Sequence, residues 1–191
     1  MINRCKWAYE ELMIEYHDKE WGLPLHDDRS LFEFLILEGA QAGLSWSTIL
    51  KRRKSYQIAF KGFNPSEVGT FKEEEIENLM QNSQIIRNRL KIKSAITGAK
   101  VFLEIQKDFG SFDKYIWSFV NGKPIINNIN KLRDIPAFTN ESEEMSKDLK
   151  KKGFSFVGPT ICYAFMQAVG MVNDHEVGCF RWKEVQNISI K

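Results

Sequence analysis

The sequence predicts an all-α fold, because helical periodicity recurs along the chain and strand periodicity does not. The clearest helical signal lies between Arg89 and Phe109, where the apolar residues follow helical spacing. The run from Leu31 to Leu37 is apolar apart from one glutamate, which indicates a central, buried helix and not a surface one. A chain of 191 residues has the length of one domain, so we expect a single helical domain over residues 1–191.

The expected helices of the N-terminal half begin at recognisable start signals. Ser30, followed by Glu33 three residues later, fits a capping box for the central helix. A second helix is expected from about residue 45 to residue 60. Pro65 fits the first position of a further helix, and the glutamates at 73–75 fit a first turn, where the helix dipole favours acidic side chains.

The C-terminal half is expected to contain two helices joined by a short turn, at about residues 142–171. Helical spacing is also present over residues 112–119. The Asn-rich residues 125–140 between them indicate a surface connection. The tail, residues 182–191, shows no pattern and is a candidate for disorder.

Composition excludes several classes of protein. The first residues lack the apolar core of a signal peptide, and no run approaches the roughly 18 apolar residues that a membrane span needs. Three cysteines are an odd number, which argues against a disulfide framework. We therefore expect a cytoplasmic protein with no membrane partner.

Charge is informative only locally, since the net charge is +2. Basic residues gather at Lys51–Lys54, at Arg87–Lys93, and at Lys147 with Lys150–Lys152. Such clusters are either solvated helix faces or contacts to phosphate groups. Composition alone leaves both readings open.

The stretch from Leu37 to Trp46 has the residues of a binding pocket. Glu38 stands at the end of the apolar run, two glycines and two alanines follow, and Trp46 comes last. A carboxylate beside an aromatic face and an open turn suits a flat, polar, cationic group. We therefore take Glu38 and Trp46 as candidate ligand-binding residues.

The turn between the two C-terminal helices has the residues of a phosphate site. Gly153 is placed to end the first helix in a left-handed conformation, and Gly158 and Thr160 flank the start of the next helix. Small residues leave the backbone N–H groups of a helix start open to an anion, and Lys151 and Lys152 add positive charge. The alternative is a plain helix–loop–helix whose glycines serve only the turn.

Cysteine and histidine residues at the two ends of the chain form a possible metal-ligand set. His175 and Cys179 are four residues apart, and Cys5 and His17 stand near the N-terminus. Two cysteines and two histidines make a full tetrahedral zinc set with no open position, so such a zinc ion would be structural. The alternative is that these are ordinary thiols and buried polar groups.

Taken together, these motifs resemble the bacterial DNA-3-methyladenine glycosylase I family, the constitutive alkyladenine glycosylases of the helix-hairpin-helix superfamily. The resemblance covers almost the whole chain. It rests on six blocks in the same order, which are residues 16–22, 37–46, 116–120, 151–154, 157–163 and 172–175.

The resemblance implies a helix-hairpin-helix glycosylase-like domain in which one structural zinc ion joins the N- and C-terminal segments. Its ligands fall on Cys5, His17, His175 and Cys179. The family's base pocket falls on Glu38, Tyr16 and Trp46, with Trp7 and Trp21 nearby. Asp174, directly before a zinc ligand, is interpreted as structural.

The implied activity is that of a DNA repair hydrolase. The enzyme flips 3-methyladenine out of alkylated double-stranded DNA and hydrolyses its N-glycosidic bond, which releases the free base and leaves an abasic site. Glu38 is the expected catalytic residue, and Leu44 is a candidate wedge that fills the gap in the base stack. No lysine stands in the pocket motifs, so a lyase step is not expected.

Two other readings remain for the sequence. A non-catalytic, zinc-stapled helical DNA-binding module explains the hairpin and the basic clusters, although it leaves the pocket residues without a role. A zinc hydrolase needs an open metal position, which four protein ligands do not provide. We expect a monomer in each case.

Overall fold

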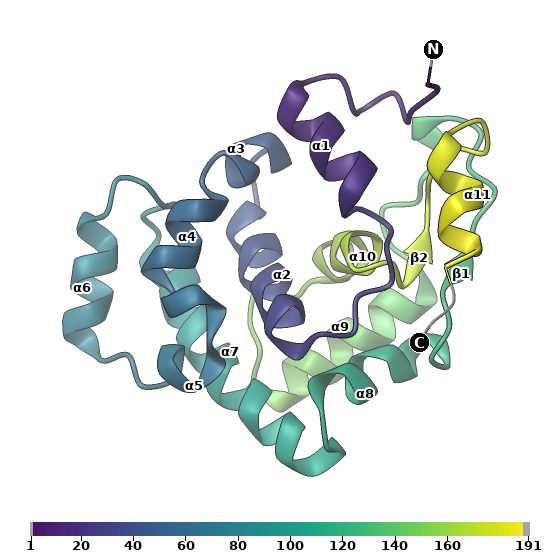
Figure 1. Ribbon diagram of the computed structural model, residues 1–191. Coiled ribbons are helices and arrows are strands. Elements are labelled where there is room, and N and C mark those ends of the chain that lie inside the picture. The colour runs from purple at the N-terminus through teal and green to yellow at the C-terminus, as the bar shows by residue number, and fades with distance from the viewer. Residues whose placement is uncertain (1, 189–191) are drawn as a thin grey trace.

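The computed structural model describes residues 2–188, and most of that chain is helical (Figure 1). The helical prediction is therefore confirmed, although two short strands are also present. The elements in chain order are α1 (Glu11–Lys19), α2 (Asp28–Gln41), α3 (Trp46–Leu50), α4 (Arg53–Ala59), η1 (Lys61–Phe63), α5 (Pro65–Val68), α6 (Glu73–Gln81), α7 (Arg89–Phe109), α8 (Phe112–Trp117), η2 (Ser118–Val120), β1 (Ile125–Ile126), η3 (Leu132–Asp134), α9 (Asn140–Lys152), α10 (Pro159–Ala168), β2 (Val172–Asn173) and α11 (Phe180–Gln186).

Helix α2 lies at the centre of the molecule, in contact with α3, α7, α8 and α10 (Figure 1). Leu31, Phe32 and Leu37 are completely or almost completely buried, as the apolar run predicts. The predicted start of this helix was wrong by three residues, because Ser30 is not the N-cap. Asp27 is the N-cap, because its carboxylate accepts from the backbone N–H of Ser30 at 2.9 Å.

The single helix expected over residues 45–60 is instead two helices, α3 and α4. The chain turns between them, and this turn places Arg53 at the start of α4 against two carboxylates from other segments. Its guanidinium pairs with Glu20 and with Glu33, each at 2.6 Å. The basic run Lys51–Lys54 therefore does not form one solvated helix face, which was one of the two readings that composition left open.

Residues 125–140 are more than a surface connection. Strand β1 pairs in parallel with β2, with Ile125 opposite Val172, and Ile129 forms an isolated bridge to Glu176. Ile129 is 6% exposed. This segment therefore ties the middle of the chain to the residues that precede α11.

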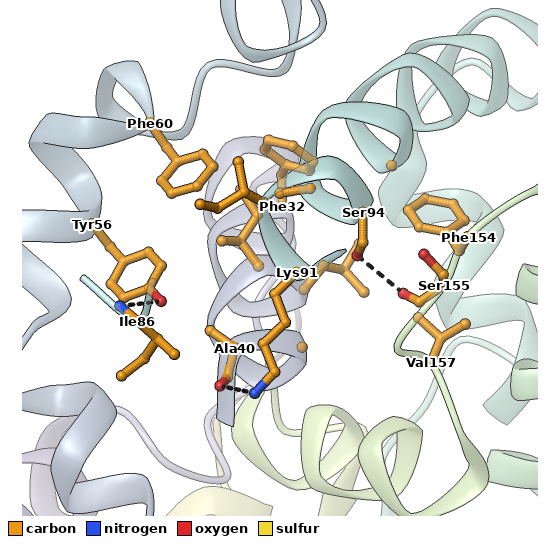
Figure 2. A pocket seen from close by; sticks show the side chains of 16 residues that line it. Phe32, Ala40, Tyr56, Phe60, Ile86, Lys91, Ser94, Phe154, Ser155 and Val157 are labelled. Carbon is orange, nitrogen blue, oxygen red and sulfur yellow. Dashed lines mark hydrogen bonds between the residues drawn. The ribbon is translucent and has the colours of Figure 1, made fainter. Parts of the chain in front are cut away.

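Helices α9 and α10 form the predicted helical hairpin. Gly153 ends α9 with a φ of 110°, the left-handed conformation that favours glycine. The loop that follows packs on the neighbouring helices, since Ser94 of α7 donates to the Ser155 carbonyl at 3.4 Å (Figure 2). A Cβ on Gly39 of α2 would lie 3.6 Å from the Cβ of Phe156, so the loop also lies close to the central helix.

The N-terminal segment lies against the C-terminal part of the chain. Asn3 donates to the carbonyl of Gly178 at 2.6 Å, and its own carbonyl accepts from Phe180. Residues 182–186, part of the tail that we considered for disorder, belong to helix α11, whereas residues 189–191 lie outside the described residues. None of the helices described is long and apolar enough to cross a membrane.

Candidate functional site

The pocket residues predicted from the sequence line one cleft, although they come from different parts of the chain. The cleft has a volume of about 410 Å³, which is within the usual range for small-molecule sites. Helices α1, α2, α3 and α10 contribute to it, together with the segments around residues 7, 21 and 132–135. The lining residues are Trp7, Met13, Tyr16, Trp21, Glu38, Gln41, Trp46, Leu132, Ile135, Ala164 and Gln167.

Glu38 is a buried carboxyl group with an unsatisfied oxygen. It lies in the last turn of α2 and is 4% exposed. Its Oε2 atom has no hydrogen-bond partner among residues 2–188. Burial raises the pKa of Glu38 to about 8, because a charged carboxylate loses the solvation of water. Buried polar atoms are normally paired, so this one indicates a place for a ligand.

Aromatic rings form the walls beside Glu38. The rings of Tyr16 and Trp46 lie 5.4 Å apart between centroids, and Trp7 meets Trp21 edge to face at 4.9 Å. The Nε1 atom of Trp46 is a second buried polar atom for which the described chain offers no partner. Burial, followed by the nearby Glu38 charge, raises the pKa of Tyr16, so its hydroxyl stays a hydrogen-bond donor.

Six lining residues were missed from the sequence, namely Met13, Gln41, Leu132, Ile135, Ala164 and Gln167. Gln41 stands within the predicted pocket stretch and could have been included. Gln167 could have been noticed as a polar residue on the otherwise apolar helix α10. Leu132 and Ile135 carried no signal, because only the pairing of β1 with β2 brings their segment to the cleft.

Asp174 does not line the cleft, but it is hydrogen-bonded to a residue that does. This residue is 1% exposed, and its carboxylate accepts three hydrogen bonds. The donors are Asn127 at 2.6 Å, Tyr163 at 2.7 Å and Gln167 at 2.7 Å. Asp174 thus fixes the side chain of the lining residue Gln167, which agrees with the structural role expected from the sequence.

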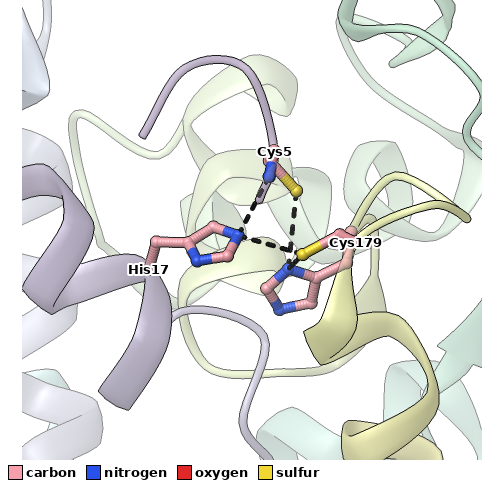
Figure 3. Close-up of side chains that lie close together, drawn as sticks. Cys5, His17 and Cys179 are labelled. Atoms are coloured by element: carbon pink, nitrogen blue, oxygen red, sulfur yellow. Dashed lines mark hydrogen bonds between the residues drawn. The ribbon is translucent and has the colours of Figure 1, made fainter. Parts of the chain in front are cut away.

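The four predicted metal ligands lie together at the junction of the N- and C-terminal segments (Figure 3). All four side chains are buried, and their ligand atoms lie within 4.8 Å of one another. The Sγ atom of Cys179 is 3.4 Å from His17 Nε2 and 3.8 Å from His175 Nδ1, and Cys5 Sγ is 3.6 Å from His175 Nδ1. Tetrahedral zinc with sulfur and nitrogen ligands separates its donors by roughly 3.3–3.8 Å, so the set fits a metal ion.

The groups behind these ligands also suit a metal. The second ring nitrogen of His17 lies 2.7 Å from Asp18, and that of His175 lies 3.1 Å from the carbonyl of Trp21. Metal-binding histidines commonly donate their other N–H to such acceptors. The hydrogen bond between the two thiols lowers the pKa of Cys179 and raises that of Cys5, so these two groups share one proton.

The hairpin presents an open surface at the start of α10. A Cβ on Gly158 would meet no atom within 4 Å, and Thr160 and Lys151 are exposed. Lys152 differs from Lys151, because its ammonium lies over the rings of Phe109 and Tyr115. Of these two lysines, Lys151 is thus the one whose charge faces solvent.

The structure also shows where Leu44 and the basic clusters Lys51–Lys54 and Arg87–Lys93 lie. Leu44 is 40% exposed in the turn between α2 and α3. Four of the eight cations in the other two clusters pair with carboxylates: Lys51 with Glu10, Arg53 with Glu20 and Glu33, Arg89 with Glu73 and Glu77, and Lys93 with Glu73. These pairs favour the hairpin over the other two clusters as the place for phosphate.

Comparison with known proteins agrees with this site. A family model described as methyladenine glycosylase matches residues 6–182. DNA-3-methyladenine glycosylase 1 of Escherichia coli (strain K12) is 48% identical over 179 residues, which cover 93% of this chain and 96% of that protein. A crystal structure of 3-methyladenine DNA glycosylase I has a TM-score of 0.91 at 49% identity, covering 93% of this chain and 98% of the other.

A second solved structure includes a bound base. It is the Y16F variant of 3-methyladenine DNA glycosylase I in complex with 3-methyladenine, with a TM-score of 0.91 at 36% identity, and it covers 94% of this chain and 97% of the other. The family-model match over residues 6–182 includes the cleft residues, the hairpin and His17, His175 and Cys179, and Cys5 lies one residue before it. The chain therefore belongs to the methyladenine glycosylase family.

Proposed function

We propose that this protein is a DNA repair glycosylase that removes 3-methyladenine from alkylated double-stranded DNA. It hydrolyses the N-glycosidic bond and leaves an abasic site. The observation that carries this proposal is the cleft of about 410 Å³ in which the unpaired, buried Glu38 faces aromatic walls. Family membership and relatives named for this activity support it.

The chemistry of the substrate explains why so few catalytic groups are needed. A 3-methylated adenine in DNA carries positive charge, which weakens its glycosidic bond and makes the base a good leaving group. Trp46 stacks on the cationic ring, an interaction worth roughly 0.5–2 kcal/mol. The Tyr16 hydroxyl donates to the edge of the base, and Glu38 accepts from its exocyclic amine.

Glu38 also provides selectivity for the charged base. In the free protein its pKa of about 8 keeps this carboxyl group neutral at pH 7. A cationic base compensates a negative charge at this position and so favours the ionised form. Unmodified adenine is neutral and does not compensate a negative charge, so its binding gains no charge attraction from Glu38.

The remaining residues hold the DNA and the site. The hairpin residues Gly153, Gly158, Thr160, Lys151 and Lys152 bind the DNA backbone, and Leu44 enters the stack where the nucleotide has left. One zinc ion on Cys5, His17, His175 and Cys179 is structural. No lysine lines the described part of the cleft, which supports hydrolysis without a lyase step.

The test is release of free base from methylated duplex DNA. We expect the wild-type protein to release 3-methyladenine, and Glu38→Gln to release it about a hundredfold more slowly, as when one pre-organised electrostatic group is lost. DNA binding by this variant should change little. Glu104→Gln, an exposed change on α7, is the matched control and should behave as wild type.

The outcomes separate the proposal from its alternatives. A non-catalytic DNA-binding module binds the duplex and releases no base. Near wild-type excision by Glu38→Gln excludes the role assigned to Glu38. A zinc hydrolase loses activity as soon as a chelator removes its metal. A glycosylase whose zinc ion is structural keeps its activity in the presence of a chelator until the protein unfolds.

A further inference from the structure

Lys91 belongs to the basic cluster Arg87–Lys93, yet its ammonium group is hydrogen-bonded within the protein. It lies in the first turn of α7, and its side chain is partly buried. Its Nζ atom donates to the backbone carbonyl of Ala40 at 2.9 Å (Figure 2) and to that of Ala42 at 2.7 Å. Lys91 therefore reaches from one helix to the C-terminal end of another, namely α2.

The end of α2 has few other means of satisfying its carbonyl groups. The last turn of α2 contains no basic residue, and Ala42 leaves the helix with φ −42° and ψ 113°. Gly43 follows at φ +80°. The last carbonyls of a helix lack partners within it, and a cation near that end is favourable for the helix dipole. Lys91 supplies both the donors and the charge.

The turn held in this way carries residues of the proposed site on both sides. Glu38 and Gln41 line the cleft from the last turn of α2. Leu44 follows at the exposed tip, where its backbone N–H donates to the Gln41 carbonyl. A shift of the end of α2 would therefore move the proposed wedge directly.

Lys91 makes these contacts in a largely apolar setting. Its side chain lines a small cavity with apolar residues of α2 and α7, among them Leu35 and Ile92. Within residues 2–188 no carboxylate forms an ion pair with Lys91, in contrast to Arg89 and Lys93 on the same helix. The two carbonyls are thus the groups that compensate the burial of this ammonium.

We propose that Lys91 is a positioning residue for nucleotide extrusion, acting through the turn at residues 42–44. It holds this turn rigid while Leu44 enters the duplex, and it touches neither the base nor the reacting bond. The inference rests on the proposed excision of 3-methyladenine. It removes Lys91 from the residues available to bind phosphate.

The test compares Lys91→Met with Lys100→Met, an exposed lysine on the same helix. Single-turnover release of 3-methyladenine is measured from a methylated duplex and from the same methylated strand without its complement. The single strand needs no extrusion from a stack. We expect Lys91→Met to slow release from the duplex about tenfold, as a small misplacement does, and to slow release from the single strand much less. Lys100→Met should match wild type on both.

A second comparison tests whether Lys91 acts through Leu44. If it does, the double variant Lys91→Met with Leu44→Ala should release base from the duplex about as slowly as Leu44→Ala alone. Should Lys91→Met fail to fold, Lys91→Gln takes its place. It keeps an uncharged amide NH2 group as a donor, so it should lower the duplex rate selectively but to a smaller extent.

The inference fails if Lys91→Met lowers the release rate on the duplex and on the single strand by the same factor, or changes neither rate. It also fails if the rate reductions of Lys91→Met and Leu44→Ala multiply in the double variant. The proposed function is tested separately in the same assay. A wild-type protein that releases no base from either DNA contradicts the excision itself, whereas an active wild type with a fully active Lys91→Met contradicts only the role of Lys91.

Discussion

At the scale of single residues, Glu38 illustrates what a sequence reveals and what it leaves out. A carboxylate at the end of an apolar helix was visible in the sequence as an exception to the pattern. Its unsatisfied oxygen and raised pKa were not, because they depend on residues from other segments that enclose it. Tyr16 lies 22 residues before Glu38, and the resemblance, not the spacing, placed it in the pocket.

The raised pKa of Glu38 predicts how stability depends on pH. The pKa of this group rises from 4.5 to about 8 on folding, so between these values the unfolded chain is ionised while the folded protein is not. The wild type should therefore lose stability relative to Glu38→Gln as the pH rises from about 4.5 to about 8, by about 1.4 kcal/mol per unit of pKa shift. Above that range the difference should stay constant.

Urea unfolding of both proteins at pH 5, 7 and 9 measures this difference in free energy. Glu104→Gln again serves as the control, because its side chain is exposed and should show no such trend. A difference between wild type and Glu38→Gln that does not change with pH would contradict the raised pKa and, with it, the proposed selectivity for a charged base.

At the scale of elements, local signals predicted well where the structure depends on neighbours in sequence. Helix α7 has the expected bounds, and Gly153 ends α9 as expected. The helix expected over residues 45–60 failed because Arg53 pairs with carboxylates 20 and 33 residues away. The prediction that residues 125–140 are a surface connection was also wrong because of a long-range contact, since β1 pairs with a strand 47 residues later.

The hairpin prediction concerns Lys151, whose charge is exposed beside the start of α10. Lys151→Gln should weaken binding to methylated and unmethylated DNA alike, since a phosphate contact carries no base information. It should also lower the slope of log affinity against log salt concentration by about 0.9, the value for one phosphate contact on a duplex. Fluorescence anisotropy at several salt concentrations measures both effects.

Lys147→Gln is the matched control for this prediction. Lys147 is a lysine on the same helix, but it pairs with Glu143 one turn earlier. If both variants keep the wild-type salt dependence, the hairpin does not bind phosphate at this position, and the basic residues that contact DNA lie elsewhere.

At the scale of the whole molecule, the two ends of the chain meet at the Cys and His cluster. Cys5 and His175 are separated by 170 residues in sequence, so the spacing could suggest a metal site but could not show that the pairs meet. The cluster also borders the proposed base site, because the ring of Trp7 lies 5.2 Å from that of His17 and 4.9 Å from that of Trp21. We infer that a metal ion held by this cluster would join the two ends of the chain to the walls of the cleft in one cooperative unit.

Loss of the metal should therefore affect both stability and excision. We expect one zinc ion per chain in the purified protein, and Cys179→Ala to lose it and to lower the melting temperature by about 10 °C, as the loss of a few kcal/mol does for a chain of this size. Excision should fall with it, because the segment that holds Trp7 against the cleft is released. Metal analysis of the unfolded protein and thermal unfolding followed by circular dichroism provide the measurements.

Cys162 provides the control that separates a metal ligand from any other buried thiol. Cys162 is also buried, but its sulfur donates to the carbonyl of Val157 and takes no part in the cluster. Cys162→Ser should keep one zinc ion per chain, and Cys179→Ser should not. If both serine variants retain the metal, Cys179 is not a required ligand. If the wild-type protein contains no metal and unfolds at the same temperature as Cys179→Ala, the two ends are joined without a metal. The walls of the cleft would in that case depend on the packing of Trp7, Trp21 and Tyr16.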